Sequence, residues 1–375
     1  MNINNPFFVR GYGGPKYFCD RVKETDRLVS AVRNERDVTL IAPRRYGKTG
    51  LIRNAFHVLE SECAVVYIDI YSTRNLAEFT KMFVDAVVGA LDTKAEKAIA
   101  NVARFFRSCR PTMTPQEVGF PKFSFDVAPS SAEATLKEAF DYIVQRDRRL
   151  VVAIDEFQQI LEYPETGTEA LLRSYMQFAP QVHFIFSGSR RHMMREMFMT
   201  PKHPFYQSTD VMTIDVIDRG AYASFARAFF NGAGCPFEDD VFARLYDHFG
   251  GITWYVQIVL NKLWEYGEGV ADDATVASAV DELVETRAFE FAELLRSQND
   301  SAQLLLRAMA AAGVVSAPQS GEFLAKCGLK AASTVASALE SLIDKDLVYR
   351  GDDGYVVYDR FFGLWLADRA VRLSV

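Results

Sequence analysis

The chain has 375 residues, of which 49% are hydrophobic and 24% are charged, and this globular composition excludes a disordered or fibrous protein. At roughly 150 residues per domain, the length allows two or three domains. The net charge of −7 gives no bulk attraction for nucleic acid, so any contact with a phosphate backbone has to be local.

Short β-branched runs alternate with longer helical segments in the first part of the chain. Strands are predicted at Val38–Ile41, Ala64–Ile68, Leu150–Ile154, Val182–Phe186 and Val211–Ile214. Helices are predicted from near Lys48, over Leu76–Leu91 and over Ser130–Gln145. Nearly continuous apolar runs suit strands that are buried on both faces, so the pattern predicts a parallel α/β sheet with right-handed crossovers.

The segment Arg110–Val127 interrupts this pattern. It carries three prolines and then alternates Phe123, Phe125 and Val127. The prolines predict a loop, and the alternation predicts a short exposed strand. Neither feature indicates a chemical role.

Helical periodicity dominates after Ile214. Helices are predicted over Ala221–Phe230, Phe237–Phe249, Trp254–Tyr266 and Asp273–Leu295. Together they predict a small helical domain.

The last predicted unit begins at Ser301. Its helices are predicted over Ala302–Ala312, Gly321–Cys327 and Ala331–Asp344, and its strands over Leu347–Arg350 and Tyr355–Tyr358. Three helices followed by a hairpin are typical of a winged helix-turn-helix. We therefore expect three domains: an α/β core at 1–217, a helical lid domain at 218–296 and a winged-helix domain at 297–375.

Two further classes of feature are missing from the sequence. The five cysteines lie far apart, so no C-x-x-C pair indicates a zinc or redox site. The N-terminus has no signal-peptide pattern, and no segment approaches the roughly 18 apolar residues of a membrane span. We expect a soluble, cytoplasmic protein with reduced thiols and no membrane contact.

A phosphate-binding loop follows the first strand. Residues 42–49 match G-x-x-x-x-G-K-[ST], with Ala42 in place of the first glycine. In such loops backbone N–H groups and a helix N-terminus face a phosphate chain. Lys48 is predicted to contact the β- and γ-phosphates, the Thr49 hydroxyl to ligate Mg²⁺, and Gly47 to avoid a collision with phosphate. The alternative is an ordinary strand-to-helix turn. The predicted nucleotide-binding residues of the loop are Pro43, Arg44, Arg45, Tyr46, Gly47, Lys48, Thr49 and Gly50.

Two carboxylates follow the predicted strand Leu150–Ile154. Asp155 is expected at the carboxyl edge of the sheet, where nucleotides bind in open α/β folds. Asp155 can hold Mg²⁺ through a water molecule, and Glu156 can orient and polarise an attacking water. The alternative is a solvated acidic strand end.

Hydroxyl and guanidinium groups follow the next strand. Ser187 or Ser189 is predicted to sense the γ-phosphate, and Arg190 or Arg191 to stabilise its charge in the transition state. A solvated basic loop is the alternative. We take Lys48, Glu156 and Ser187 as the candidate catalytic residues.

Together these motifs resemble the archaeal-type ATPases of the P-loop class, which are related to AAA+ and STAND NTPases. The shared patterns are F-x-[DG]-R-x-x-E at residues 18–24, P-R-R-x-G-K-T at 43–49, D-E-F-Q at 155–158, F-S-G-S at 186–189 and P-F-Y at 204–206. Two further patterns depart at a proline: G-G-x-P-x-Y-x-Q has Thr253, and D-P-F-F-x-x-W-L has Arg360.

The resemblance implies a P-loop NTPase sheet of the additional-strand, catalytic-glutamate type, followed by a helical lid and a winged helix. It also implies binding of ATP and Mg²⁺, hydrolysis of ATP, and a place for Arg21 in the region that covers the nucleotide base. AAA+ relatives complete their sites with an arginine from a neighbour, so an oligomer is compatible with the resemblance, but no residue here can be assigned that task.

Three functional hypotheses remain open at this point. The chain is an ATPase whose hydrolysis moves the lid and the winged helix, a low-turnover switch with the same site, or a DNA-associated protein. Residues 321–345 contain three basic and three acidic residues, and Asp352 and Asp353 lie at the wing tip, which favours a protein partner over DNA. An inactive scaffold is disfavoured by the intact site residues Lys48, Thr49, Asp155 and Glu156.

Overall fold

The computed structural model describes residues 5–91, 105–114, 122–146, 148–238, 240–267, 269–351 and 353–367. Asp352, which the sequence places at the wing tip, lies outside these residues. The chain packs as two compact units, one of Arg10–Ile217 and one that joins the described parts of Met1–Val9 and Asp218–Val375. No helix in the described residues is long and apolar enough to span a membrane.

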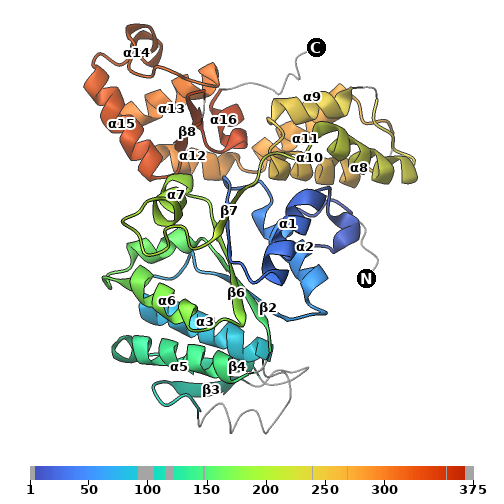
Figure 1. The fold of residues 1–375 in the computed structure, drawn as a ribbon. Helices are drawn as coiled ribbons and strands as arrows, with labels where there is room; N and C mark the ends of the chain where they lie inside the picture. Colours follow the sequence, from blue (N-terminus) through green and yellow to red (C-terminus); the bar gives the residue numbers. More distant parts are fainter. Residues whose placement is uncertain are drawn as a thin grey trace. The chain divides into compact units, whose positions relative to one another are not determined.

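A five-stranded sheet forms the centre of the unit Arg10–Ile217 (Figure 1). Its strands are β1 (Val38–Ile41), β2 (Ala64–Asp69), β5 (Leu150–Asp155), β6 (Val182–Gly188) and β7 (Asp210–Thr213). Their order is β2-β5-β6-β1-β7, and all neighbouring strands run parallel. The strand β6 therefore lies between β1, which leads into the phosphate loop, and β5, which ends in Asp155. This order confirms the predicted additional-strand sheet.

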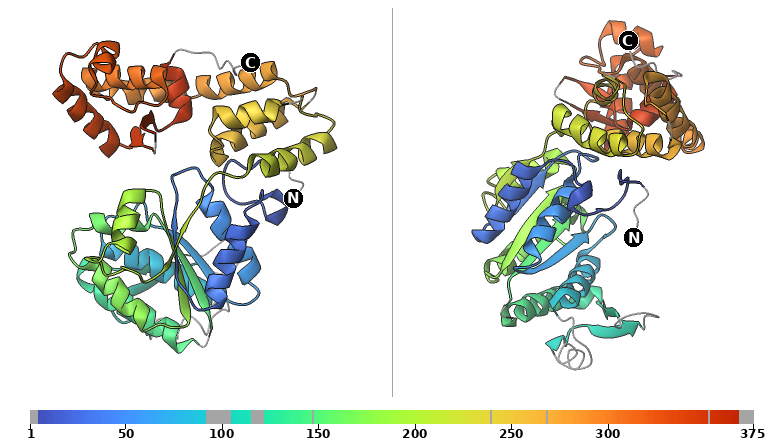
Figure 2. Two further views of the ribbon diagram at one scale, coloured as in Figure 1. Left: turned by 45° about the horizontal axis from the view of Figure 1, so that its top comes forward. Right: turned by 90° about the vertical axis from the view of Figure 1, so that its right-hand side faces the viewer.

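Helices cover both faces of this sheet (Figure 2). One face carries α1 (Val22–Arg33) and α2 (Lys48–Leu59); the other carries α3 (Leu76–Leu91), α5 (Ala132–Gln145), α6 (Thr168–Gln177) and α7 (Arg191–Met199). Short 3-10 helices are η1 (Pro15–Tyr17), η2 (Pro129–Ser131) and η3 (Phe157–Glu162). All six residues of β5 are buried, because Val151 and Ala153 pack toward α1 and α2 while their neighbours pack toward the other face.

The segment between α3 and α5 differs from the prediction. The strands β3 (Arg110–Thr114) and β4 (Lys122–Asp126) pair antiparallel, so residues 110–114, which were predicted as part of a loop, form a strand. Residues 115–121 of the predicted loop lie outside the described residues. Phe125 is fully buried, so the prediction of an exposed strand was wrong. Asp85 Oδ1 accepts the Phe125 N–H at 2.8 Å, and Lys81 Nζ donates to its carbonyl at 2.9 Å. These contacts from α3 satisfy the β4 backbone, and they cannot be deduced from local sequence.

The second unit begins with helices, as predicted after Ile214. They are α8 (Arg219–Gly232), α9 (Val241–His248), α10 (Thr253–Tyr266), α11 (Asp273–Glu285) and α12 (Ala288–Arg296). The single helix predicted over Asp273–Leu295 was wrong, because the chain leaves the helix before α12. Arg287 lies at φ −105° and holds its guanidinium over the rings of Trp254 and Phe361, 5.3 and 5.2 Å from their centroids.

The winged helix is confirmed in the same unit. It consists of α13 (Asp300–Ala312), α14 (Gly321–Cys327), α15 (Ala332–Asp344) and the antiparallel pair β8 (Val348–Arg350) and β9 (Tyr355–Val357). The helix α16 (Arg360–Leu366) follows and was not predicted from periodicity. The Asp359 carboxylate caps it by accepting the N–H groups of Phe361 and Phe362.

The N-terminal segment packs within this second unit. Phe7 is fully buried against the rings of Phe230 and Trp264, and its carbonyl accepts a hydrogen bond from the Asn261 side chain. The contacts therefore join residues 5–9 to the unit that begins at Asp218. The three domain boundaries predicted from sequence stay predictions.

Candidate active site

The loop between β1 and α2 has the backbone that a phosphate-binding loop requires. Gly47, the residue before α2, lies at φ 89° and ψ 21°, a left-handed conformation that glycine adopts without a Cβ penalty. Arg45 is also left-handed, at φ 73°. Gly47 at the N-cap has no side chain that could cap the first turn of α2, and N–H groups at such a helix start can bind an anion.

Lys48 lies at the centre of this loop. Its side chain is buried, and its ammonium group donates to the carbonyls of Ala42 at 2.8 Å and Pro43 at 3.1 Å. Burial lowers the pKa of Lys48, and the negative charges of Asp155 and Glu156 partly offset that effect. The amine is thus held against the loop, beside two carboxylates.

Thr49 and Asp155 meet at the carboxyl edge of the sheet, as the sequence predicts. The Thr49 hydroxyl lies 3.3 Å from Asp155 Oδ2, and the backbone N–H of Glu156 donates to Asp155 Oδ1 at 3.1 Å. Thr49 is exposed while Asp155 is buried, so this pair of oxygens borders solvent.

Tyr67 is a site residue that the sequence analysis missed. Its hydroxyl lies 2.5 Å from Asp155 Oδ2 and 3.4 Å from the Thr49 hydroxyl. Burial, followed by the charge of Asp155, raises the pKa of Tyr67, so the phenol stays protonated and donates. The sequence feature that could have identified Tyr67 is its position two residues before the end of a strand. Using that feature requires knowing that β2 pairs with β5.

Glu156 turns out of the sheet at the end of β5. It lies at φ 56° and ψ 40°, an uncommon left-handed conformation for a residue with a Cβ. Its Oε2 accepts hydrogen bonds from Gln158 Nε2 at 2.6 Å, from the Ser189 hydroxyl at 2.7 Å and from the Ser189 N–H at 3.3 Å. The carboxylate is therefore fixed by the adjacent strand end.

The two candidate serines lie in different surroundings. Ser187 is fully buried within β6, and its hydroxyl has no hydrogen-bond partner in the part of the chain that the structure describes. Ser189 is the serine that contacts Glu156. A Cβ at Gly188 between them would collide with the side chains of Gln158 and Met194, so a larger residue would displace these side chains. The predicted catalytic role of Ser187 stays a prediction.

The predicted arginines make distinct contacts. Arg21 is buried and donates to the backbone carbonyls of Tyr46 at 3.3 Å and Asp215 at 2.5 Å. It therefore contacts the loop through the backbone of Tyr46. The Arg44 guanidinium lies over the Tyr71 ring, 5.6 Å from its centroid. Arg190 forms an ion pair with Glu162.

These residues fit a triphosphate with Mg²⁺. The loop offers N–H groups and a buried cation to phosphate, and Thr49 and Asp155 offer the hard oxygen ligands that Mg²⁺ prefers. The described residues contain no group of three or more His, Cys, Asp or Glu side chains arranged to hold a metal ion.

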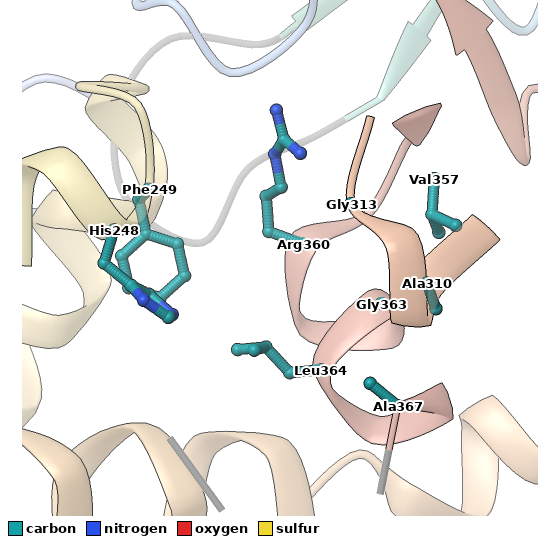
Figure 3. Close-up of a pocket in the computed structure, with 9 residues that line it drawn as sticks. All are labelled: His248, Phe249, Ala310, Gly313, Val357, Arg360, Gly363, Leu364 and Ala367. Carbon is teal, nitrogen blue, oxygen red and sulfur yellow. The ribbon is translucent and has the colours of Figure 1, made fainter. Parts of the chain in front are cut away.

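A separate cavity of about 170 Å³ lies within the second unit (Figure 3). It is lined by His248, Phe249, Ala310, Gly313, Val357, Arg360, Gly363, Leu364 and Ala367. None of the predicted site residues belongs to this lining, because all of them lie within Arg10–Ile217. The candidate site is therefore the carboxyl edge of the five-stranded sheet and not this cavity.

Comparison with protein families identifies the family of this chain. Residues 18–259, more than half of the chain, match the family described as the ATPase domain predominantly from Archaea. The chain belongs to this archaeal ATPase family. Residues 289–368 match a second family, described as a probable winged helix domain. The resemblance seen in the sequence is thereby confirmed. Among curated proteins none matches the sequence.

Solved structures show the same fold as this archaeal-type ATPase. The Walker-type ATPase of Pyrococcus abyssi superposes with a TM-score of 0.64 at 17% identity and covers 96% of this chain and 99% of its own. The Aeropyrum pernix ORC2 protein, in ADPNP and ADP complexes, gives 0.56 at 16% identity and 96% of both chains. The Aeropyrum pernix ORC1 protein, in complex with DNA, gives 0.54 at 14% identity and 98% of both chains.

Proposed function

We propose that this chain is an Mg²⁺-dependent ATP hydrolase that uses the edge formed by β1, β5 and β6. One observation carries the proposal: Lys48, the Thr49–Asp155 pair and Glu156 lie together at the carboxyl edge of the sheet. The chain that contains this sheet belongs to an ATPase family. Bound Mg²⁺ neutralises phosphate charge. The identity of the nucleotide as ATP is inferred from the family.

The loop binds the triphosphate in this proposal. Its N–H groups at the start of α2 and the Lys48 ammonium group face the phosphates, and Thr49 and Asp155 hold the cation. Arg21 keeps the loop in place through the carbonyl of Tyr46. The proposed contact residues are Pro43, Arg44, Arg45, Tyr46, Gly47, Lys48, Thr49 and Gly50, with Ser187 retained as a γ-phosphate sensor.

Glu156 acts as the general base. Its three hydrogen bonds all reach Oε2, so no described residue donates to Oε1, which is the atom proposed to accept a proton from water. The Ser189 N–H and hydroxyl hold the carboxylate in one orientation. That orientation matters because a general base works only within hydrogen-bond reach of its water.

Phosphate release measured with and without Mg²⁺ tests the proposal. Lys48→Ala should lose ATP binding together with hydrolysis. Glu156→Gln should keep ATP binding while hydrolysis falls about 100-fold or more, the contribution typical of a general base. A wild-type rate no faster than that of Glu156→Gln would exclude a hydrolase and leave the low-turnover switch as the better account.

A protein partner is favoured over DNA for the winged helix. The exposed positions of α15 include Ser333, Ser337, Glu340 and Asp344, and none of these carries a positive charge. Lys345 donates to Gln298 at 2.8 Å. Such a surface neutralises few phosphates, so we expect no salt-dependent retention on duplex DNA. Retention on duplex DNA that falls steeply with salt would favour DNA over a protein partner.

We also propose that the helical lid and the winged helix, predicted at 218–296 and 297–375, respond together to ATP. Both parts lie in one compact unit, and α16 contacts both α11 and α13 within it. A nucleotide-driven movement of one part would therefore carry the other with it.

A further inference from the structure

Tyr67 reaches the metal-binding pair from the neighbouring strand. Its position in β2 lies opposite Ala153 in β5, two residues before Asp155, and both side chains belong to the face covered by α1 and α2. Because the Ala153 side chain is a single methyl group, the phenol has room to extend along that face. The hydroxyl ends 2.5 Å from Asp155 Oδ2.

The Tyr67 ring is itself held in place. The Arg53 guanidinium from α2 lies over it, 4.3 Å from the ring centroid, a distance typical of a cation–π contact. The ring is half-buried and packs against the cluster that includes Leu51 and Ile52. The hydroxyl therefore approaches the carboxylate from a fixed direction.

Both oxygens of Asp155 are engaged by these contacts. Oδ1 accepts the Glu156 N–H at 3.1 Å, and Oδ2 is shared by the hydroxyls of Thr49 and Tyr67. A carboxylate bound on both oxygens cannot rotate without losing a hydrogen bond. Hydrogen bonds to a metal-ligating carboxylate orient it and tune its affinity for the metal.

We propose that Tyr67 is a positioning residue that orients Asp155 for the divalent cation bound with ATP. The inference rests on the proposed function, since it concerns the same cation. It predicts that the Tyr67 hydroxyl contributes to the gain in ATP affinity that Mg²⁺ provides, and not to the binding of the triphosphate by the loop.

Calorimetric titration of ATP, with Mg²⁺ and with a chelator, tests this proposal on Tyr67→Phe. This variant keeps the ring and its contact with Arg53 and removes only the hydroxyl. The Mg²⁺-dependent gain in affinity should fall about tenfold, at the lower end of the effect of losing such an orienting group, while affinity in the chelator stays at the wild-type value. Tyr175→Phe is the matched control, since it removes a phenol hydroxyl from α6 in the same unit.

A second variant shows whether Tyr67 acts through Asp155. In an Asp155→Asn background, Tyr67→Phe should produce no further loss of Mg²⁺-dependent affinity. An unchanged Mg²⁺ gain in Tyr67→Phe, or an equal loss with and without Mg²⁺, would overturn the proposal. Absence of ATP binding by the wild-type chain would instead overturn the proposed function.

Discussion

One oxygen of Glu156 accepts hydrogen bonds from two residues, and the two side-chain donors have different origins. Gln158 lies two residues after Glu156, in η3, whereas Ser189 is the residue that follows β6. The carboxylate thus joins the end of β5 to the end of the strand inserted beside it. Its orientation depends on the packing of β6 against β5, and Gly188 permits the close approach of Gln158.

Replacing Ser189 by alanine should slow hydrolysis without weakening ATP binding. The variant loses the 2.7 Å bond to Glu156 but keeps the backbone N–H and Gln158 donors. A hydrogen bond to a charged group contributes about 1.5–3 kcal/mol, and about 1.4 kcal/mol corresponds to tenfold in rate. We expect kcat to fall about tenfold or more, measured by steady-state phosphate release. An identical kcat would show that Ser189 does not position the base.

Ser187→Ala is the companion measurement. The two serines are two residues apart, but only Ser189 touches Glu156. A fall in kcat for Ser187→Ala with full activity in Ser189→Ala would support the sensor role predicted for Ser187 and contradict the geometric argument for Ser189.

The sequence predicts the site residues that belong to a motif, and it misses those that depend on strand pairing. Lys48 and Thr49 follow from the loop pattern, and Asp155 follows from its place after an apolar run. Tyr67 and the contact of Ser189 with Glu156 follow only from the order β2-β5-β6. A one-residue change in register would turn these side chains to the opposite face, so they could not be assigned before the sheet was known.

At the scale of elements, the residue that precedes β1 is a titratable group with a structural role. Asp37 Oδ1 accepts the backbone N–H of Phe184 in β6 at 2.7 Å. Burial raises the pKa of Asp37 to about 6, although this hydrogen bond and the charge of Arg173 oppose the shift. The folded protein therefore retains a proton that the unfolded chain releases near pH 3.8.

Asp37 should make stability fall as pH rises. Its contribution is fully present below the unfolded-state pKa of 3.8 and is lost as pH increases through about 6, since the unfolded state then binds fewer protons. Asp37→Asn keeps an oxygen acceptor for Phe184 and removes the charge. Thermal unfolding across this range should give a smaller decline of Tm for the variant than for the wild type. Parallel Tm curves would contradict the assignment.

Elements with a strong local pattern were predicted within about two residues of their ends. The strand β1 and the helix α3 match the predicted bounds, because their apolar runs are bounded by clear turn signals. The strand β3 and the break between α11 and α12 were missed, whereas a strand was predicted where β4 lies. The strand β3 depends on its pairing with β4, which local sequence does not show. At the break between α11 and α12 a tertiary contact opposes the local helical preference, because Arg287 lies over two aromatic rings.

At the scale of the whole molecule, two motifs about a hundred residues apart meet in the second unit. The Tyr255 hydroxyl, from the glycine-rich motif before and in α10, accepts the backbone N–H of Arg360 at 2.8 Å and lies 3.4 Å from Asp359 Oδ1. The Phe361 ring packs edge-on against Tyr255 at 5.2 Å. A proline at position 360 would have no N–H to donate, so the arginine that departs from the family pattern adds this bond.

This junction should hold α16 against α10, and Tyr255→Phe tests it. The variant keeps the ring contacts and leaves the partly buried Arg360 N–H without its hydroxyl acceptor, and such a loss costs about 1–3 kcal/mol for a fully buried group. Amide hydrogen exchange in α16 should accelerate about tenfold, while residues within Arg10–Ile217 keep their rates. Tyr349→Phe, which removes another hydroxyl from the same unit, serves as the control. Unchanged exchange in α16 for Tyr255→Phe would mean that this hydrogen bond does not hold α16 against α10.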